Sequence, residues 1–294
     1  IKVRHGQFKW AFLKEVSIYS FWIFLNVIMD RIYWSTGQFV LGIYRGAAAI
    51  AVYAVAIQLQ NMYMMFSTAI SGVFLPKVTA MVAKENNPKA ISDLFIRTGR
   101  IQYIVMSFIL CAFIVLGRPF IELWAGAGYE DAYIIALLFF IAVTVPLIQN
   151  LGITILQARN QMKFRSLLYI FIAVGSLGIS IPLTKFYGGI GCAVGTATAL
   201  TLGQIIIMNI YYRSKQGLDI IAFWREIIKM TIVPLIICSL SYIALQNYSI
   251  TSWTSFAIAS IIFSVIYLTT FFRFSMNSSE RELFVKPLMK IIKR

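Results

Sequence analysis

Long apolar runs separated by short basic segments dominate the chain. Eight of these runs are long enough to cross a bilayer, which takes about 20 residues of helix. They lie at residues 16–37, 47–72, 101–117, 132–155, 166–184, 190–212, 230–247 and 253–272. Because the runs do not alternate apolar and polar positions, the pattern predicts helices rather than barrel strands. We therefore expect an all-α, polytopic membrane helix bundle of about eight transmembrane helices.

The composition supports the same class. Charged residues make up 13% of the chain and hydrophobic residues 60%, whereas a soluble domain has about 25% charged residues. The formal net charge of +15 raises the question of a nucleic-acid partner. The basic residues lie in short segments between apolar runs, not on one folded face, so we expect no nucleic-acid binding.

The basic residues are distributed unevenly between the two sides of the predicted membrane. If the start of the chain is cytoplasmic, the inside segments hold 22 of the 26 Lys and Arg residues. These segments are 1–15, 73–100, 156–165, 213–229 and 273–294. The outside loops hold only Arg45, Arg118 and Lys185. The positive-inside rule therefore predicts that both ends of this chain are cytoplasmic.

Two inside segments have an amphipathic pattern. Residues 217–229 place Leu218, Ile221, Trp224 and Ile228 at helical spacing. In the basic tail, Ser279 precedes Glu282 by three residues, as in a capping box. Both segments suit helices that lie on anionic inner-leaflet lipids.

The sequence offers no catalytic or metal-binding constellation. His5 is the one histidine, and the three cysteines, Cys111, Cys192 and Cys238, lie inside apolar runs without metal-ligand spacing. The outside loops are short, and the longest, residues 117–132, has about 16 residues. We expect no cofactor and no metal, and we expect that the protein is not an enzyme.

Asp30 and Arg31 interrupt the first apolar run. A charge inside a bilayer costs several kcal/mol and therefore indicates a functional site. Adjacent residues on a helix point about 100° apart, so the two charges do not pair face to face. Asp30 shares a helix face with Asn26 and Tyr33, which predicts a stripe facing a cavity. Arg31 is either an anchor at the outer headgroups or a cation in the cavity.

Uncharged polar residues occur in two further runs. Gln58 and Asn61 lie three residues apart in the second run, and Gln149 and Asn150 follow Pro146 in the fourth. A proline bends such a helix and frees a backbone carbonyl. Together these residues are candidates for a polar translocation path, although hydrogen bonding between helices explains each one equally well.

Small residues recur every four positions in the sixth run. They are Gly191, Gly195, Ala199 and Gly203. Such a stripe lets a neighbouring helix approach closely. We interpret it as a helix-packing surface and not as a nucleotide loop, because it lies within a predicted span.

Several stretches resemble the polysaccharide repeat-unit flippases of the Wzx (O-antigen) type, which belong with the MATE exporters and the lipid II flippases. The stretch "DRIYWSTGQFVLGIYRGAAAIAVYAVAIQLQNMY" resembles the start of that family's second half. "FLPKVTAMVAKENNPKAISDLFIRTGR", "ILQARNQMKFRS" and "YGGIGCAVGTATAL" are similar to later loops and helices of the same half. The resemblance covers roughly residues 10–212.

The resemblance implies a fold and an organisation of the chain. Residues 16–212 would form the C-terminal six-helix lobe of a two-lobed transporter, after a cytoplasmic lead-in at 1–15. A connector at 213–229, an extra helix pair at 230–272 and a basic tail at 273–294 would follow. The chain begins at Ile1, and we expect an N-terminal lobe to be missing from it.

The resemblance also implies a function. It is the flipping of undecaprenyl-diphosphate-linked oligosaccharides across the bacterial plasma (inner) membrane by alternating access, for O-antigen and lipopolysaccharide biosynthesis. Asp30 would then respond to a coupling H⁺ or Na⁺, and Arg31 would meet the diphosphate. Flippase cavities of this family tend to be cationic, and Arg31 is the one cation that the spans offer here. A MATE-type drug/cation antiporter and a membrane glycan polymerase or glycosyltransferase remain as alternatives.

Overall fold

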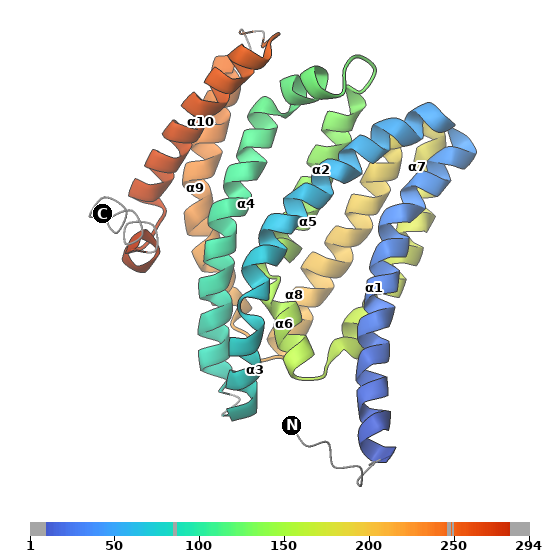
Figure 1. The fold of residues 1–294 in the computed structure, drawn as a ribbon, viewed down its shortest axis with the longest axis vertical. Coiled ribbons are helices and arrows are strands. Elements are labelled where there is room, and N and C mark those ends of the chain that lie inside the picture. Colours follow the sequence, from blue (N-terminus) through green and yellow to red (C-terminus); the bar gives the residue numbers. More distant parts are fainter. Residues whose placement is uncertain (1–9, 85–86, 246–247, 249, 283–294) are drawn as a thin grey trace, which may run out of the picture.

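The computed structural model describes residues 10–84, 87–245, 248 and 250–282, and this part of the chain is helical and contains no strand. The elements are α1 (Trp10–Tyr44), α2 (Ala47–Gly72), α3 (Leu75–Lys84), α4 (Pro88–Trp124), α5 (Asp131–Ile148), α6 (Leu151–Ala158), α7 (Met162–Leu200), the π-helix η1 (Thr201–Ile207), α8 (Met208–Ser214), α9 (Ile220–Leu245) and α10 (Trp253–Phe274) (Figure 1). Among the described residues, seven helices are long and apolar enough to cross a membrane. The predicted fold class, a polytopic helical bundle, is therefore confirmed.

The longest of the seven, Met162–Ser214, is bent back on itself at Gly188. Gly188 has a φ of 60°, a conformation that glycine adopts without steric cost. After this turn the two arms run side by side in opposite directions (Figure 1). Ser180 Oγ of the first arm donates to the Cys192 carbonyl of the second at 3.1 Å. The hairpin thus makes two crossings out of one continuous apolar segment.

The small residues of the sixth run lie at the contact between these two arms. An added Cβ at three of them would overlap the first arm; the pairs are Gly191 with Leu183, Gly195 with Ser180, and Gly203 with Ile172. Ala199, the remaining member of the stripe, is also buried. The absence of a side chain at Gly191 and Gly195 lets the two arms approach backbone against backbone, and Gly203 leaves room for the Ile172 side chain.

The connections of the bundle lie at two ends. The segments that join α2 to α4, α6 to α7, and α8 to α9 lie at the lower end in Figure 1. The α1–α2 and α4–α5 connections and the turn at Gly188 lie at the upper end. We call the lower one the basic end, since the Lys- and Arg-rich segments of the described chain gather there. This arrangement is that of a multi-pass membrane protein.

The segment predicted as a separate surface connector, residues 213–229, has a different structure. Residues 220–229 are the first turns of α9, which continues without a break to Leu245. Phe223 is fully buried against α4, with its ring 5.0 Å from that of Phe95. Ile221 and Ile228, which we expected to face lipid headgroups together with Trp224, are 50% and 62% exposed. The face that packs against the bundle carries Ile220, Phe223 and Ile227, each one position before a residue of the predicted face.

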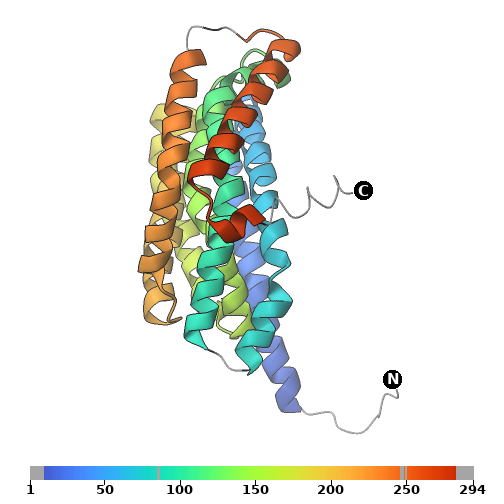
Figure 2. The same cartoon turned by 90° about the vertical axis from the view of Figure 1, so that its left-hand side faces the viewer.

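The predicted capping box in the tail is also placed differently. Asn277, not Ser279, caps the short turn after α10: its Oδ1 accepts from the Glu280 N–H, and Glu280 Oε2 accepts from the Asn277 N–H, both at 2.9 Å. Figure 2 shows this turn lying across α4. Residues 1–9 and 283–294, most of the predicted lead-in and basic tail, lie outside the described residues.

Candidate functional site

The fourth apolar run, which we predicted as one span at 132–155, is interrupted in its second half. Helix α5 ends at Ile148 and α6 begins at Leu151, so Gln149 and Asn150 form a break just after Pro146. Proline cannot donate a backbone hydrogen bond, so the usual helical bond to the Ala142 carbonyl is missing one turn before the break. The break therefore places two adjacent amide side chains, Gln149 and Asn150, between α5 and α6.

Side chains from α8 and α9 form a hydrogen-bond network with Gln149 at this break. Gln149 and Asn209 of α8 form a pair of amide hydrogen bonds of 2.9 and 3.2 Å. Trp224 Nε1 of α9 donates to the same Asn209 oxygen at 3.0 Å. Gln149 therefore serves as a bridge between helices and does not line a cavity.

A cavity of about 460 Å³ lies in front of the break, between α1, α2 and the start of α7. Five of the residues predicted for a translocation path line it: Asn26, Asp30, Arg31, Asn61 and Asn150. Two others do not, since Gln149 is buried behind the cavity and Gln58 is exposed elsewhere on α2. We call this space the Asp30 cavity.

Tyr33 does not share the cavity face with Asp30, contrary to the helical-face argument. It is 2% exposed, and its hydroxyl donates to the Thr196 carbonyl of α7 over 2.5 Å. Its ring also packs edge-on against Trp34, which does line the cavity. Tyr33 therefore fastens α1 to the α7 hairpin.

Arg165 is the cavity residue that sequence reasoning missed. It extends from the first turn of α7, is 7% exposed and lines the Asp30 cavity. Its Nη2 donates to the Tyr169 hydroxyl at 3.2 Å, and its guanidinium lies over the Tyr169 ring at 5.0 Å. Its Nε has no hydrogen-bond partner among the residues that the structure describes. No carboxylate of the described residues lies within 4.0 Å of this guanidinium.

The carboxylate of Asp30 faces this cation from α1. Among the charged side chains around it, Arg165 exerts the strongest attraction on this carboxylate, followed by Arg31, and the side chains of Trp34 and Tyr169 lie close to it. Neither arginine forms an ion pair with Asp30 within 4.0 Å. Two arginines and one aspartate leave the cavity with a surplus of positive charge, and such a site attracts an anion.

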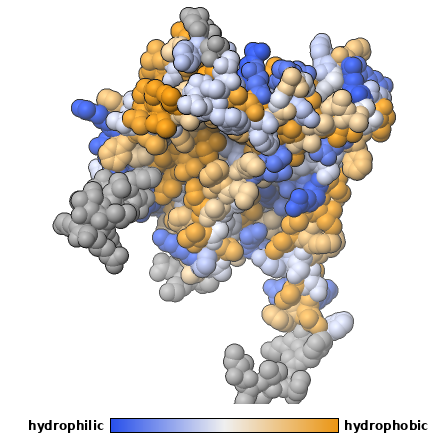
Figure 3. Space-filling view, turned by 45° about the horizontal axis from the view of Figure 1, so that its top comes forward, coloured by the Kyte–Doolittle hydropathy of each residue, from blue (hydrophilic) through white to orange (hydrophobic). Residues whose placement is uncertain are grey.

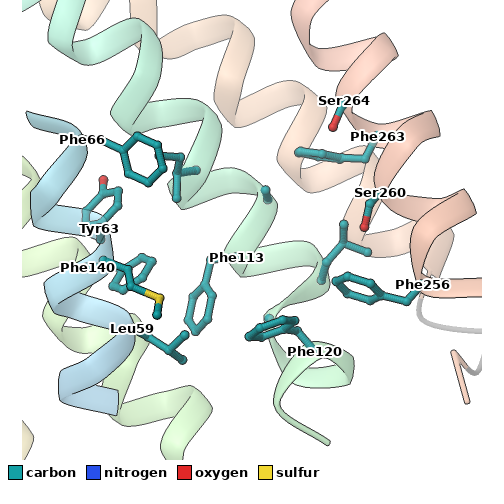
Figure 4. Close-up of a pocket in the computed structure, with 15 residues that line it drawn as sticks. Leu59, Tyr63, Phe66, Phe113, Phe120, Phe140, Phe256, Ser260, Phe263 and Ser264 are labelled. Atoms are coloured by element: carbon teal, nitrogen blue, oxygen red, sulfur yellow. The ribbon is translucent and has the colours of Figure 1, made fainter. Parts of the chain in front are cut away.

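A second pocket, of about 260 Å³, has the opposite character (Figure 4). Aromatic rings from α2, α4, α5 and α10 converge on it, among them Tyr63, Phe113 and Phe263. The Tyr63 hydroxyl is already bonded to the Met106 carbonyl and to Thr144. This pocket can hold hydrocarbon, but it offers no charged group to an ion.

The surface has the mixture expected of such a molecule. In the space-filling view, hydrophobic residues spread over much of the visible face, and hydrophilic residues gather in patches among them (Figure 3). Large apolar side chains such as Phe39, Phe171 and Ile243 are more than 60% exposed. A surface of this kind requires lipid or another protein around it.

Comparison with known proteins finds a family match for the first part of the chain. A family model described as "Polysaccharide biosynthesis protein" matches residues 2–134. That range includes α1, α2, α3, α4 and the start of α5, and with them Asp30, Arg31 and Asn61. No match was found among curated proteins or solved structures. The chain is thus a multi-pass helical membrane protein whose residues 2–134 match a polysaccharide biosynthesis protein family, the kind of family that its resemblance to flippases implied.

Proposed function

We propose that the protein is a lobe of a flippase that moves undecaprenyl-diphosphate-linked oligosaccharides across the bacterial inner membrane by alternating access. The observation that carries this proposal is Arg165, a buried guanidinium that has no carboxylate partner among the described residues and lines a cavity between helices. A guanidinium presents a planar fork of donors that matches phosphate oxygens in a bidentate manner. A diphosphate would supply the negative charge that this cavity lacks.

The same charges argue against a drug/cation antiporter. Asp30 is the one carboxylate among the residues that line the cavity, and Arg31 and Arg165 line it as well. A cationic substrate would approach two positive charges for one negative charge, which costs binding energy. An anionic headgroup would instead be attracted by the two arginines more than it is repelled by the one aspartate.

A glycan polymerase or glycosyltransferase would need available carboxylates at the end opposite the basic end, and the contacts of Glu122 and Glu130 there do not favour this role. Glu122 there is paired with Arg118 at 3.1 Å. The Gly128 N–H donates to Glu130 and holds the pKa of that carboxylate below its usual range, which weakens it as a general acid. These contacts favour a transporter over an enzyme.

The remaining parts of the proposal follow from the membrane topology. The basic end would face the cytoplasm and its anionic lipids, and both ends of this chain would lie there. The open side of the Asp30 cavity, between α1 and α2, would face the N-terminal lobe. Asp30 would bind or release a coupling H⁺ or Na⁺ and thereby change the charge that Arg165 meets.

The test is a comparison of Arg165→Ala with Lys163→Ala in the native host. Lys163 is an exposed cation two residues away on the same helix, and its ammonium lies 5.6 Å from the Trp22 ring. A charge-assisted hydrogen bond contributes about 1.5–3 kcal/mol, so Arg165→Ala should slow flipping about ten- to a hundredfold. Surface polysaccharide should fall and the lipid-linked repeat unit should accumulate, with equal protein in the membrane. Equal flipping by both variants would refute the proposal.

Asp30→Asn tests the coupling role separately. The substitution keeps the size of the side chain and removes its charge. We expect less surface polysaccharide at an unchanged amount of inserted protein. Normal polysaccharide with Asp30→Asn would eliminate the coupling role and leave the role of Arg165 standing.

A further inference from the structure

A second polar cavity, of about 390 Å³, opens at the basic end. The first turns of α1, helix α3 and the α6–α7 connection form its walls. It shares no lining residue with the Asp30 cavity. We call it the vestibule.

The vestibule and the Asp30 cavity are aligned along two common walls. On α1, Tyr19 of the vestibule precedes Asp30 by eleven residues, which is about three turns and about 16 Å of rise, so both lie on one helix face. On the other wall, Gln157 follows Asn150 by seven residues, or about two turns. A ligand held in the Asp30 cavity can therefore continue into the vestibule along the same helices.

The polar groups of the vestibule are not occupied by the protein itself. Glu15, Tyr19, Gln157 and Asn160 make no side-chain hydrogen bond or ion pair within the described part of the chain. Asn160 adopts a φ of 55°, a left-handed conformation that asparagine tolerates better than most residues. A carboxylate, a phenol and two amides thus face one space, each with free donors or acceptors.

This set of groups fits a sugar and not a phosphate. Amides, a phenol and a carboxylate can each hydrogen-bond to hydroxyl groups, and the ring of Phe12 adds an apolar surface for the C–H face of a sugar. Among the described residues, no lysine or arginine lines the vestibule, whereas two arginines line the Asp30 cavity. Asn160 precedes Arg165 by five residues, so the two kinds of site adjoin.

We propose that the vestibule is a saccharide subsite that selects neutral or amino sugars over acidic ones. The inference rests on the proposed function, because it assigns the diphosphate of the same substrate to Arg165. Glu15 is the one charged residue that lines the vestibule within the described part of the chain. Its carboxylate accepts hydrogen bonds from hydroxyl or ammonium groups and repels the carboxylate of a uronic acid.

The test measures binding of three defined probes to the purified full-length protein in lipid nanodiscs. The probes are a short-chain prenyl diphosphate alone, the same lipid with a neutral disaccharide, and the same lipid with a disaccharide that contains a hexuronic acid. We expect the neutral disaccharide to bind about tenfold tighter than the bare diphosphate, from one or two net hydrogen bonds. The lipid with the acidic disaccharide should bind no tighter than the bare diphosphate.

Variants assign the effect to the vestibule. Glu15→Gln should abolish the discrimination between neutral and acidic disaccharides, and Gln157→Ala should reduce the neutral-sugar gain about fivefold. Glu122→Gln, at the opposite end of the bundle, removes an acidic charge outside the vestibule and should change neither. Glu15 is exposed, so its substitution does not threaten folding.

The outcomes separate the two proposals. If all three probes bind equally well and Arg165→Ala weakens them equally, the saccharide subsite is refuted and the flippase function stands. If the acidic disaccharide binds best, the selectivity is refuted. If no probe binds, the diphosphate site fails and the subsite fails with it.

Discussion

Replacement of Arg100 by alanine should release the segment after α10 from the bundle. Arg100 Nε donates to Glu280 Oε1 at 2.6 Å, and Nη2 donates to Glu280 Oε2 at 2.9 Å. Its Nη1 donates to Glu226 Oε2 at 2.6 Å. One guanidinium thereby joins α4, α9 and the turn capped by Asn277.

The loss of unfolding free energy expected for Arg100→Ala follows from how deeply Arg100 and its two partners are buried. The side chains of Arg100 and Glu280 are 8% and 3% exposed, and that of Glu226 is 34% exposed. Removal of one partner from a buried pair costs about 3–5 kcal/mol. We expect the lower limit, about 3 kcal/mol, because solvent screens Glu226 and because the turn can move into water instead of keeping a buried charge. At about 2–4 °C per kcal/mol, the apparent Tm should fall by about 6–12 °C.

The assay is thermal unfolding in detergent at one fixed scan rate, since membrane proteins often unfold irreversibly. Arg118→Ala is the matched control, because Arg118 lies on the same helix and pairs with Glu122 at a site where both side chains are largely exposed. Its loss should cost at most about 0.5 kcal/mol. The combination of Arg100→Met with Glu280→Leu should recover most of the stability, since it leaves no unpaired charge between these positions. An apparent Tm for Arg100→Ala equal to that of Arg118→Ala would refute the argument.

The other stability predictions concern close packing and the helix break. Gly195→Ala should lower the apparent Tm by an overpacking cost of about 1–3 kcal/mol, because the new methyl would overlap the Ser180 backbone. Gly175→Ala, where a Cβ meets nothing within 4 Å, should instead be neutral or stabilise by up to about 1 kcal/mol; equal effects of the two would contradict the hairpin geometry. Asn209→Leu should destabilise by about 2 kcal/mol because it leaves the Gln149 amide unpaired, and an unchanged Tm would show that this amide bridge is dispensable.

Most of the fold could be predicted from the pattern of apolar residues. The second run, predicted at 47–72, coincides with α2, and the glycine at the turn between the fifth and sixth runs is where α7 folds back. Errors arose where an apolar face packs against protein instead of lipid. For residues 217–229, periodicity alone indicates an amphipathic helix, but it does not say that Phe223 lies against α4. Both environments bury the same kinds of side chain, so the pattern cannot separate them.

Only part of the candidate site could be predicted from the sequence. Asp30 and Arg31 stand out because each is a charge inside an apolar run, and both line the cavity. Gln149 and Asn150 are adjacent amides that look equivalent in the sequence, yet one bonds to Asn209 behind the break and the other faces the cavity. The break itself decides this difference, because it changes the direction in which consecutive side chains point.

Arg165 was missed for a reason that concerns the positive-inside rule itself. The rule counts cations near the ends of spans, and it counts Lys163 and Arg165 alike. Two residues apart on a helix, these side chains point about 200° apart, so one faces outward while the other faces the bundle interior. Lys163 is exposed beside Trp22, and Arg165 is buried in the Asp30 cavity. A segment can therefore orient the protein with one cation and bind an anion with the next, and burial, not charge, is what distinguishes the two roles.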